Sequence, residues 1–332
     1  MANGAEHAER TAIGVFDELA RRTFVIVSGK GGVGRTTVAA LCGLALADRG
    51  RRVLVATTGH DDRLAWMLGA PALTDEPTLV EPGLSIQRLS APACVREYGA
   101  LVLRSSRLSS AVFDNGVVSR LMRAIPGLDD FSVVGKAWHD AFRSGAYDTV
   151  VFDGPATGHL LYTLGVPRAI RQTIAPGPLT REAELMCAHF EDRSRTAALL
   201  VGLPERWPLT ELDELGVGLS DQVGIGLAAV VVNGLWPADA VGPLAPGTDE
   251  APRAVVDAVS RVCAIGQRQD REIAAWAAAG TARRTTLTLP WRFEGIGDEA
   301  ALRGLLAAAT GPRNYREDAD VTISGADSEV GT

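Results

Sequence analysis

Residues 29–37 read Gly-Lys-Gly-Gly-Val-Gly-Arg-Thr-Thr, and their types and spacing suit the binding of a phosphate chain. Glycines lack a Cβ and adopt positive φ angles, which point successive backbone N–H groups inward around an anion. In a phosphate-binding loop, the hydroxyl after the basic residue holds Mg²⁺, and here that residue is Thr36. We therefore predict that a nucleotide is bound by Gly29, Lys30, Gly31, Gly32, Val33, Gly34, Arg35, Thr36 and Thr37.

The flanking residues predict the elements that position this loop. Residues 23–28 form an apolar, β-branched run of strand length, and residues 38–48 are rich in Ala and Leu at helical spacing. The positive N-terminal end of that helix adds to the attraction for phosphate. A second strand predicted at residues 52–57 completes a β-α-β unit, whose strands are parallel with a right-handed crossover.

A carboxylate ends the next clear buried strand, which is predicted at residues 147–153 and ends in Asp153. The carboxyl ends of parallel strands meet at one edge of the sheet, so Asp153 is expected beside the glycine loop. Carboxylate and hydroxyl oxygens suit Mg²⁺. We expect Thr36 and Asp153 to form the metal site.

Composition narrows the class of protein. The chain has 332 residues, 46% of them hydrophobic and 22% charged, which is ordinary for a globular protein. Its net charge of −7 provides no basic face, so a nucleic-acid partner is not expected. No apolar run is long enough to span a bilayer, and residues 1–22 are charged, so we predict a cytoplasmic protein. The four isolated cysteines are interpreted as buried thiols, and they are Cys42, Cys94, Cys187 and Cys263.

Two departures from the usual G-x-x-x-x-G-K-[ST] loop carry information. The expected lysine is Arg35, and an extra lysine, Lys30, follows the first glycine. The only other lysine is Lys136, so Arg35 also fits a chain in which arginine generally replaces lysine. Because a guanidinium is planar and forked where an ammonium is compact, the exchange is expected to slow chemistry at a tight phosphate cradle.

The early lysine and the segment after Asp153 resemble the ArsA-like ATPases, a deviant Walker A class that includes arsenite-transporting and tail-anchored-protein-targeting ATPases. Residues 154–159 read Gly-Pro-Ala-Thr-Gly-His, where that family has a switch II similar to T-A-P-T-G-H. The resemblance implies ATP and Mg²⁺ as cofactors, with Lys30 reaching across a dimer and Gly158 sensing the γ-phosphate through its N–H. His159 either couples nucleotide state to the following helix or is satisfied by backbone at the helix start.

The segment after the second strand resembles the family's switch I, T-D-P-A-H-S-L, with one residue inserted. Thr57 and Leu64 match its ends, and the aspartate that acts on the attacking water falls on Thr58. A neutral hydroxyl is a poor substitute for a carboxylate base. Asp61 or Asp62 takes over that role in one interpretation; in the other, both belong to a solvated acidic turn.

Further along, the resemblance implies that Asn233 and Pro290 line the adenine pocket. An Asn amide offers a donor and an acceptor to an adenine ring, although an Asn that caps a turn before Gly234 is the alternative. Residues 125–130 resemble the family's P-G-[IL]-D-[DE] turn in a helical insertion that contacts clients, and residues 204–211 resemble its P-E-x-x-P-x-x-E segment.

The predicted fold class is α/β: a doubly wound, mainly parallel sheet of P-loop NTPase type with a helical insertion. Strands are expected to begin near residues 23, 52, 84, 147, 196, 225 and 285. One P-loop ATPase domain covers residues 1–311, with the insertion at about 93–145 and 160–195, and residues 312–332 form a disordered acidic tail. The family's arsenite-transporting member is a tandem duplication, so this single cassette is expected to need a second chain.

Two functions follow. The first is a Mg²⁺-dependent ATPase that works as a nucleotide-switched homodimer or heterodimer, with a hydrophobic or membrane-protein client and with Lys30, Arg35, Thr58 and Gly158 at the catalytic centre. The second is a hydrolysis-impaired regulatory subunit that pairs with a competent paralogous ATPase. A partitioning ATPase on DNA or membrane is disfavoured, because the chain has no basic face or basic amphipathic helix. Arsenite transport has no supporting cysteine cluster.

Overall fold

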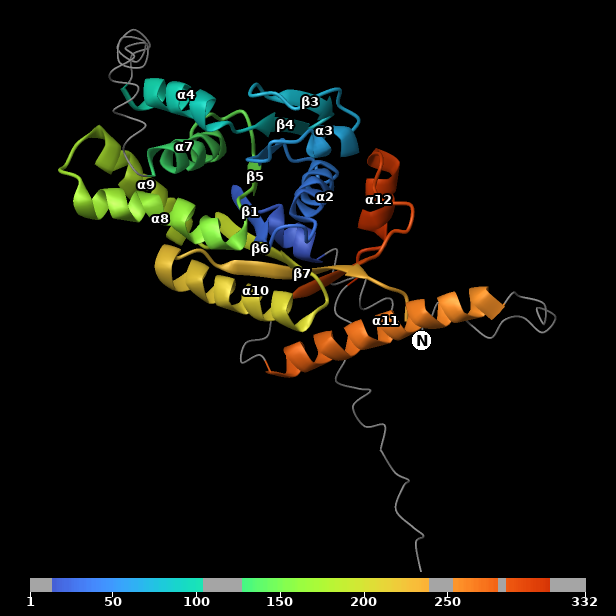
Figure 1. The fold of residues 1–332 in the computed structure, drawn as a ribbon. Coiled ribbons are helices and arrows are strands. Elements are labelled where there is room, and N and C mark those ends of the chain that lie inside the picture. The colour runs from blue at the N-terminus through green and yellow to red at the C-terminus, as the bar shows by residue number, and fades with distance from the viewer. Residues whose placement is uncertain (1–13, 104–126, 239–252, 280–284, 311–332) are drawn as a thin grey trace, which may run out of the picture.

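A computed structural model describes residues 14–103, 127–238, 253–279 and 285–310, and Figure 1 shows its central sheet. The sheet has eight strands in the order β3-β4-β2-β5-β1-β6-β7-β8. All neighbouring strands are parallel except β3 and β4, which are antiparallel. The strands are β1 (Phe24–Gly29), β2 (Val53–Thr57), β3 (Thr78–Glu81), β4 (Leu84–Arg88), β5 (Thr149–Asp153), β6 (Thr196–Gly202), β7 (Leu227–Leu235) and β8 (Thr286–Pro290).

Helices cover both faces of the sheet, so its central strands are buried throughout. Successive side chains of a strand point to opposite faces. In β1, Val25 and Val27 therefore join one apolar core, whereas Phe24 and Ile26 join the other. The first core lies under α2 (Arg35–Ala47), α3 (Arg63–Met67) and α12 (Glu299–Ala307). The second lies under α7 (Leu128–Phe142), α8 (Thr157–Thr173), α9 (Pro178–Glu191), α10 (Arg206–Gly218) and a π-helical turn, η1 (Leu219–Val223).

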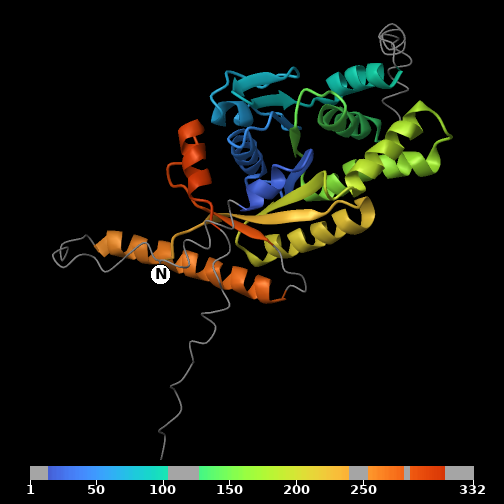
Figure 2. The same cartoon turned by 180° about the vertical axis from the view of Figure 1, so that it is seen from behind.

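Two further helices lie at the periphery. Helix α4 (Ala91–Leu103) packs on α7, and α11 (Arg253–Ala279) runs beside α10. Figures 1 and 2 show that the long α11 extends beyond the body of the domain. Its buried residues all belong to the second half of the helix, and they are Gly266, Gln269, Ile273 and Trp276. The first half of α11 therefore contributes little to the core.

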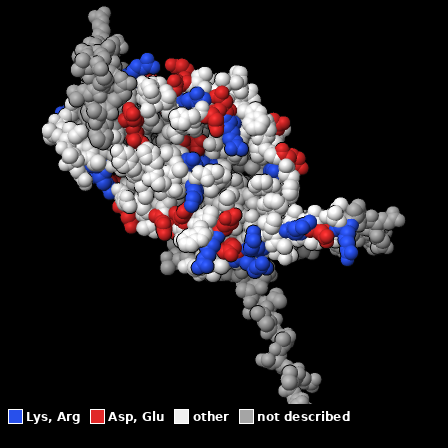
Figure 3. Space-filling view, in the orientation of Figure 1, with Lys and Arg blue, Asp and Glu red and all other residues white. Residues whose placement is uncertain are grey.

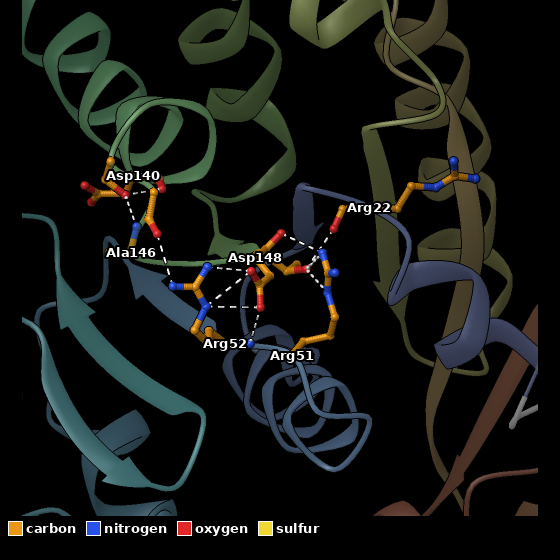
Figure 4. Close-up of polar contacts among 9 residues, drawn as sticks. Arg22, Arg51, Arg52, Asp140, Ala146 and Asp148 are labelled. Carbon is orange, nitrogen blue, oxygen red and sulfur yellow. Dashed lines mark hydrogen bonds and ion pairs between the residues drawn. The ribbon is translucent and has the colours of Figure 1, made fainter.

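At the strand ends opposite the glycine loop, an ion pair and hydrogen bonds connect β2 and β5 (Figure 4). Arg52, which precedes β2, contacts the Asp148 carboxylate at 2.7 Å. The adjacent Arg51 donates to the Asp148 backbone carbonyl at 2.8 Å. Hydrogen bonds from Arg52 lower the pKa of Asp148 to about 2. These contacts tie the starts of β2 and β5 together, which keeps their far ends in register at the loop edge.

The α/β fold class predicted from the sequence is confirmed, and each of the seven expected strands is present. The short edge strand β3 escaped prediction because its residues are exposed or half-buried and lack the apolar run of a buried strand. None of the helices in the described ranges is long and apolar enough to cross a membrane, and the cytoplasmic location stays a prediction. The predicted tail at 312–332, most of the loop at 237–250 and the middle of the insertion lie outside the described residues.

Charges on the face shown in Figure 3 are of both signs. Lysine and arginine side chains are interspersed with aspartate and glutamate. No large patch of one sign stands out on this face, which agrees with the net charge of −7. A long polyanion would find no continuous basic track on this face.

Candidate nucleotide site

The loop between β1 and α2 has the backbone conformation of an anion cradle. Gly32 and Gly34 have φ values of 82° and 94°, in the left-handed region that side chains with a Cβ rarely adopt. At Gly34 a Cβ would also lie 2.3 Å from the Asn233 amide nitrogen. Glycine is therefore required at this position both by the backbone angle and by the close approach of a neighbouring strand.

A carboxylate and two hydroxyls meet where the loop joins α2. Asp153 Oδ2 accepts hydrogen bonds from the hydroxyls of Thr36 at 2.8 Å and Thr57 at 2.7 Å. Asp153 is buried at the end of β5, and desolvation raises the pKa of its carboxyl. A bound cation would offset that desolvation, and hard oxygen donors suit Mg²⁺. The predicted metal residues thus come together in a site that fits the ion.

The glycine loop is also joined to the segment that follows Asp153. The Arg35 guanidinium donates to the Gly154 carbonyl at 2.5 Å, and the Ser28 hydroxyl donates to the Pro155 carbonyl at 2.8 Å. Arg35 is half-buried and lines the cavity described below. Arg35 therefore connects the glycine loop to the segment that follows Asp153.

Asn233 is a half-buried residue of β7 that contacts the glycine loop. Its amide nitrogen donates to the Val33 carbonyl at 2.8 Å. One of the two N–H groups of this amide is therefore engaged by the loop, and the second N–H and the carbonyl oxygen remain for other partners. The donor-and-acceptor contact with an adenine ring stays a prediction.

A cavity of about 550 Å³ is lined by Gly34, Arg35, Thr36 and Asn233. It runs from the glycine loop across α3 to the loop after β8. Its lining includes Pro290, whose predicted place beside the base is consistent with this position. The lining residues are Gly32, Gly34, Arg35, Thr36, Thr37, Asp61, Arg63, Met67, Leu203, Asn233, Gly234, Pro290, Trp291, Arg292, Phe293, Gly295, Ile296 and Leu305.

Comparison with known proteins shows which family the chain resembles. A family profile described as anion-transporting ATPase, ArsA type, matches residues 22–176, from the start of β1 to the end of α8. Over these residues the chain is similar to the ArsA-like ATPase family. The matched residues contain the glycine loop, Asp153 and the Gly-Pro-Ala-Thr-Gly-His segment, which are the parts that carry the geometry described above.

Three relatives show how far the similarity extends. The chain is 30% identical over 233 residues to a putative arsenical pump-driving ATPase of Halobacterium salinarum, covering 65% of this chain and 36% of the relative. It is 29% identical over 223 residues to the ATPase BagA of Mycobacterium tuberculosis, covering 64% of this chain and 65% of the relative. It is 26% identical over 307 residues to the arsenical pump-driving ATPase of Acidiphilium multivorum, covering 86% of this chain and 49% of the relative. The chain thus spans between about a third and two thirds of these relatives.

Within this ArsA-like fold, the structure separates the two acidic residues of the switch I segment. Asp61 lines the cavity, and its charge raises the pKa of Asp153 further, after the larger effect of desolvation. Asp62 instead pairs with Arg88 at 2.7 Å and accepts from the Leu73 N–H. Thr58 is half-buried, and its N–H donates to the Asp153 carbonyl at 3.3 Å. The carboxylate that faces the phosphate cradle is therefore Asp61.

Lys30 lies outside the cavity lining and is held by its own chain. Its ammonium contacts Glu211 of α10 at 2.7 Å, and its side chain is 55% exposed. Glu211 is the last residue of the segment that resembles the family's P-E-x-x-P-x-x-E pattern. This segment therefore contains Glu211, the residue that pairs with Lys30, although the spacing of the pattern does not itself predict this ion pair.

His159 connects the segment after Asp153 to α7. Its Nε2 lies 2.8 Å from Asp130 Oδ1, which also accepts from the Thr163 hydroxyl at 2.7 Å. This contact favours the coupling interpretation of His159 over a residue satisfied only by backbone. Gly158 is exposed in the first turn of α8, where backbone N–H groups have no intrahelical partner. It does not line the cavity in this conformation.

The cysteines are dispersed. Cys42, Cys94 and Cys187 are buried and Cys263 is half-buried. Burial raises the pKa of the Cys42 and Cys94 thiols to about 12. Across the described ranges, no three His, Cys, Asp or Glu side chains are grouped as a metal site would require. The interpretation of these cysteines as buried thiols is confirmed for Cys42, Cys94 and Cys187.

Proposed function

We propose that this chain is a Mg²⁺-dependent ATPase that works as a nucleotide-switched dimer. The observation that supports it is a cavity lined by the glycine loop, by Asn233 and Pro290, and by Thr36, whose hydroxyl donates to the Asp153 carboxylate. That arrangement fits a triphosphate, its metal and an adenine base in one site. The relatives are named as ATPases, which supports the same activity.

The reaction is the attack of water on the γ-phosphorus, with cleavage of its bond to the β–γ bridging oxygen and release of ADP and phosphate. Backbone N–H groups of Gly31 to Gly34 and the Arg35 guanidinium hold the phosphates in line for this attack. Thr36 and Asp153 would hold Mg²⁺, which would neutralise charge on the phosphates when it is bound. Asp61 accepts a hydrogen bond from the attacking water and orients it.

The switch follows from contacts that converge on the phosphate. Arg35 touches the Gly154 carbonyl, and His159 touches Asp130 of α7. A γ-phosphate that draws the Gly158 N–H toward the cradle would pull the start of α8 and, through His159, the N-terminal end of α7. In the dimer, Lys30 leaves Glu211 and contacts the nucleotide of the second subunit.

The primary experiment measures ATP binding and ATP hydrolysis by the purified chain with Mg²⁺, alongside Lys30→Ala and Arg35→Ala variants. Turnover that depends on Mg²⁺ and is lost in Lys30→Ala supports a dimeric ATPase. Absence of ATP binding under these conditions overturns the proposal. Excess EDTA provides a control for the metal, because it should remove turnover while the glycine loop remains intact.

A hydrolysis-impaired subunit of a heterodimer is the second candidate. Two observations favour it: the basic residue of the loop is Arg35, already bonded to Gly154, and the position matched to the catalytic aspartate is Thr58. This candidate predicts tight ATP binding without turnover by the chain alone. Addition of a paralogous ATPase with an intact loop lysine and switch I aspartate should then restore hydrolysis.

A further inference from the structure

Three arginines line the cavity beside the glycine loop, and they are Arg35, Arg63 and Arg292. Among the described residues of that lining, Asp61 is the only acidic one. The cavity is therefore rich in positive charge, although the whole chain carries a net charge of −7. A triphosphate carries more negative charge than one Mg²⁺ neutralises, so each of these guanidiniums could bind a phosphate oxygen.

The other basic side chains near the glycine loop have contacts elsewhere in the chain. Arg35 donates to a backbone carbonyl of the segment after β5. The guanidinium of Arg292 lies against α12, where a Cβ added to Gly304 would be 3.7 Å from the Arg292 Nη2. Lys30 lies outside the cavity lining and pairs with Glu211 at 2.7 Å. None of these three side chains is therefore dedicated to the end of a phosphate chain in this conformation.

Arg63 differs from them because its guanidinium is uncommitted. It is the first residue of α3, and its backbone N–H donates to Asp61 Oδ1 at 3.2 Å. The residue is exposed, and within the described ranges its side chain forms no hydrogen bond or ion pair. The donors of Arg63 are therefore free to bind a ligand in the cavity that this residue lines.

The geometry of α3 places Arg63 on the side of the glycine loop. Residues four apart lie on one face of a helix, so Arg63 shares its face with Met67. The Met67 sulfur accepts from the Thr37 hydroxyl at 3.7 Å, and both residues line the cavity. Thr37 is the last residue of the predicted phosphate-binding loop. Arg63 therefore lies on the face of α3 that contacts this loop.

We propose that Arg63 binds the γ-phosphate of the nucleotide held by its own subunit. The inference rests on the proposed ATPase function and adds to it a residue that recognises ATP over ADP. A guanidinium is a planar fork whose N–H groups match two oxygens of one phosphate. Because Lys30 acts across the dimer in the proposed function, Arg63 gives each subunit a γ-phosphate contact before a second subunit arrives.

The test measures the affinity of the full-length chain for ADP and for a non-hydrolysable ATP analogue, each with Mg²⁺, by calorimetry. Arg63→Gln removes the charge, and Arg63→Lys keeps the charge but removes the fork. Arg181→Gln is the matched control, because Arg181 is an exposed arginine of α9 outside the cavity lining. Arg63→Gln is also made in the Lys30→Ala chain, which separates a contact within one subunit from one that depends on the second subunit. Thermal melting of every variant checks that the fold is retained.

We expect Arg63→Gln to weaken binding of the ATP analogue by about 10- to 150-fold, since a hydrogen bond to a charged group contributes that much. Its ADP affinity should stay unchanged, because ADP has no γ-phosphate. Arg63→Lys should lose less than Arg63→Gln, and Arg181→Gln should match the wild type. The factor lost through Arg63→Gln should be the same in the Lys30→Ala chain, because independent contacts contribute additively.

Three results would overturn the assignment of Arg63. The first is an affinity for the ATP analogue that is equal in Arg63→Gln and the wild type. The second is an equal loss for ADP, because the effect would then not lie at the γ-phosphate. The third is a loss that disappears in the Lys30→Ala chain, because Arg63 would then act only through the dimer. A wild-type chain that binds neither nucleotide overturns the proposed ATPase function itself, and this assignment with it.

Discussion

The proposed role of Asp61 in orienting the attacking water can be tested by comparing Asp61 with the adjacent Asp62. Asp61 and Asp62 are consecutive carboxylates with different surroundings: Asp61 lines the cavity, and Asp62 pairs with Arg88 at 2.7 Å. Changing each to Asn removes one negative charge and almost no volume. The Asp61 oxygen that accepts from the Arg63 N–H can be replaced by the Asn carbonyl oxygen, so the local turn should survive.

The two substitutions should differ in what they affect. Loss of a carboxylate that orients and activates the attacking water lowers turnover by about 100- to 10,000-fold. That factor corresponds to about 3–5 kcal/mol of transition-state stabilisation. Asp62→Asn breaks an ion pair in which the carboxylate is 57% exposed, and such surface pairs contribute about 0–1 kcal/mol to stability. The Asp62 variant should therefore remain folded and active.

The assay is steady-state phosphate release with saturating ATP and Mg²⁺, together with ATP affinity and melting temperature for each variant. Asp61→Asn should bind ATP at least as well as the wild type, because a negative charge near the phosphates has been removed. Turnover in Asp61→Asn that matches both Asp62→Asn and the wild type would refute the assignment. The double variant Asp61→Asn, Thr58→Asp tests whether a carboxylate at position 58, which the resemblance matches to the catalytic aspartate, restores turnover.

Three further perturbations test other parts of the structure. Glu211→Gln removes the charge that holds Lys30, so ATP-dependent dimerisation should occur at lower ATP concentration in analytical ultracentrifugation; an unchanged midpoint would argue against an intrachain restraint. Gly34→Ala places a Cβ at a φ of 94°, which costs about 1–3 kcal/mol of strain and should lower both the melting temperature and ATP affinity. Because the pKa of Asp148 is lowered to about 2 in the folded state, its pairing with Arg52 stabilises the fold at pH 4 and above and is lost as the pH falls toward 2. Urea denaturation of the wild type and Asp148→Asn should show a stability difference that shrinks over that pH range, and a constant difference would contradict the pairing.

Local patterns in the sequence were sufficient to predict the strands and helices and the proximity of Thr36 and Asp153, the proposed metal ligands. The buried strands are continuous apolar runs, and in a parallel sheet their carboxyl ends share one edge. This rule alone places Thr36 near Asp153, and the structure gives 2.8 Å between their oxygens. The edge strand β3 was missed because it is too exposed to carry the same pattern.

Other features depend on contacts between residues far apart in the chain. The interpretation of Asp61 and Asp62 stayed open in the sequence because consecutive carboxylates are equivalent until a turn points one into the cavity and the other toward Arg88. Asn233 was predicted to contact an adenine ring, and only the fold shows that one of its amide N–H groups donates to Val33, 200 residues away.

The parallel α/β sheet, the glycine loop and the carboxylate of Asp153 at the carboxyl ends of its strands could be predicted from the sequence, because strand periodicity and glycine conformation are local properties. Which side chains surround the glycine loop depends on the tertiary structure. It set Lys30 on Glu211, His159 on Asp130 and Trp291 on Trp236, since each of these pairs joins separate elements whose approach depends on how the helices and neighbouring strands pack.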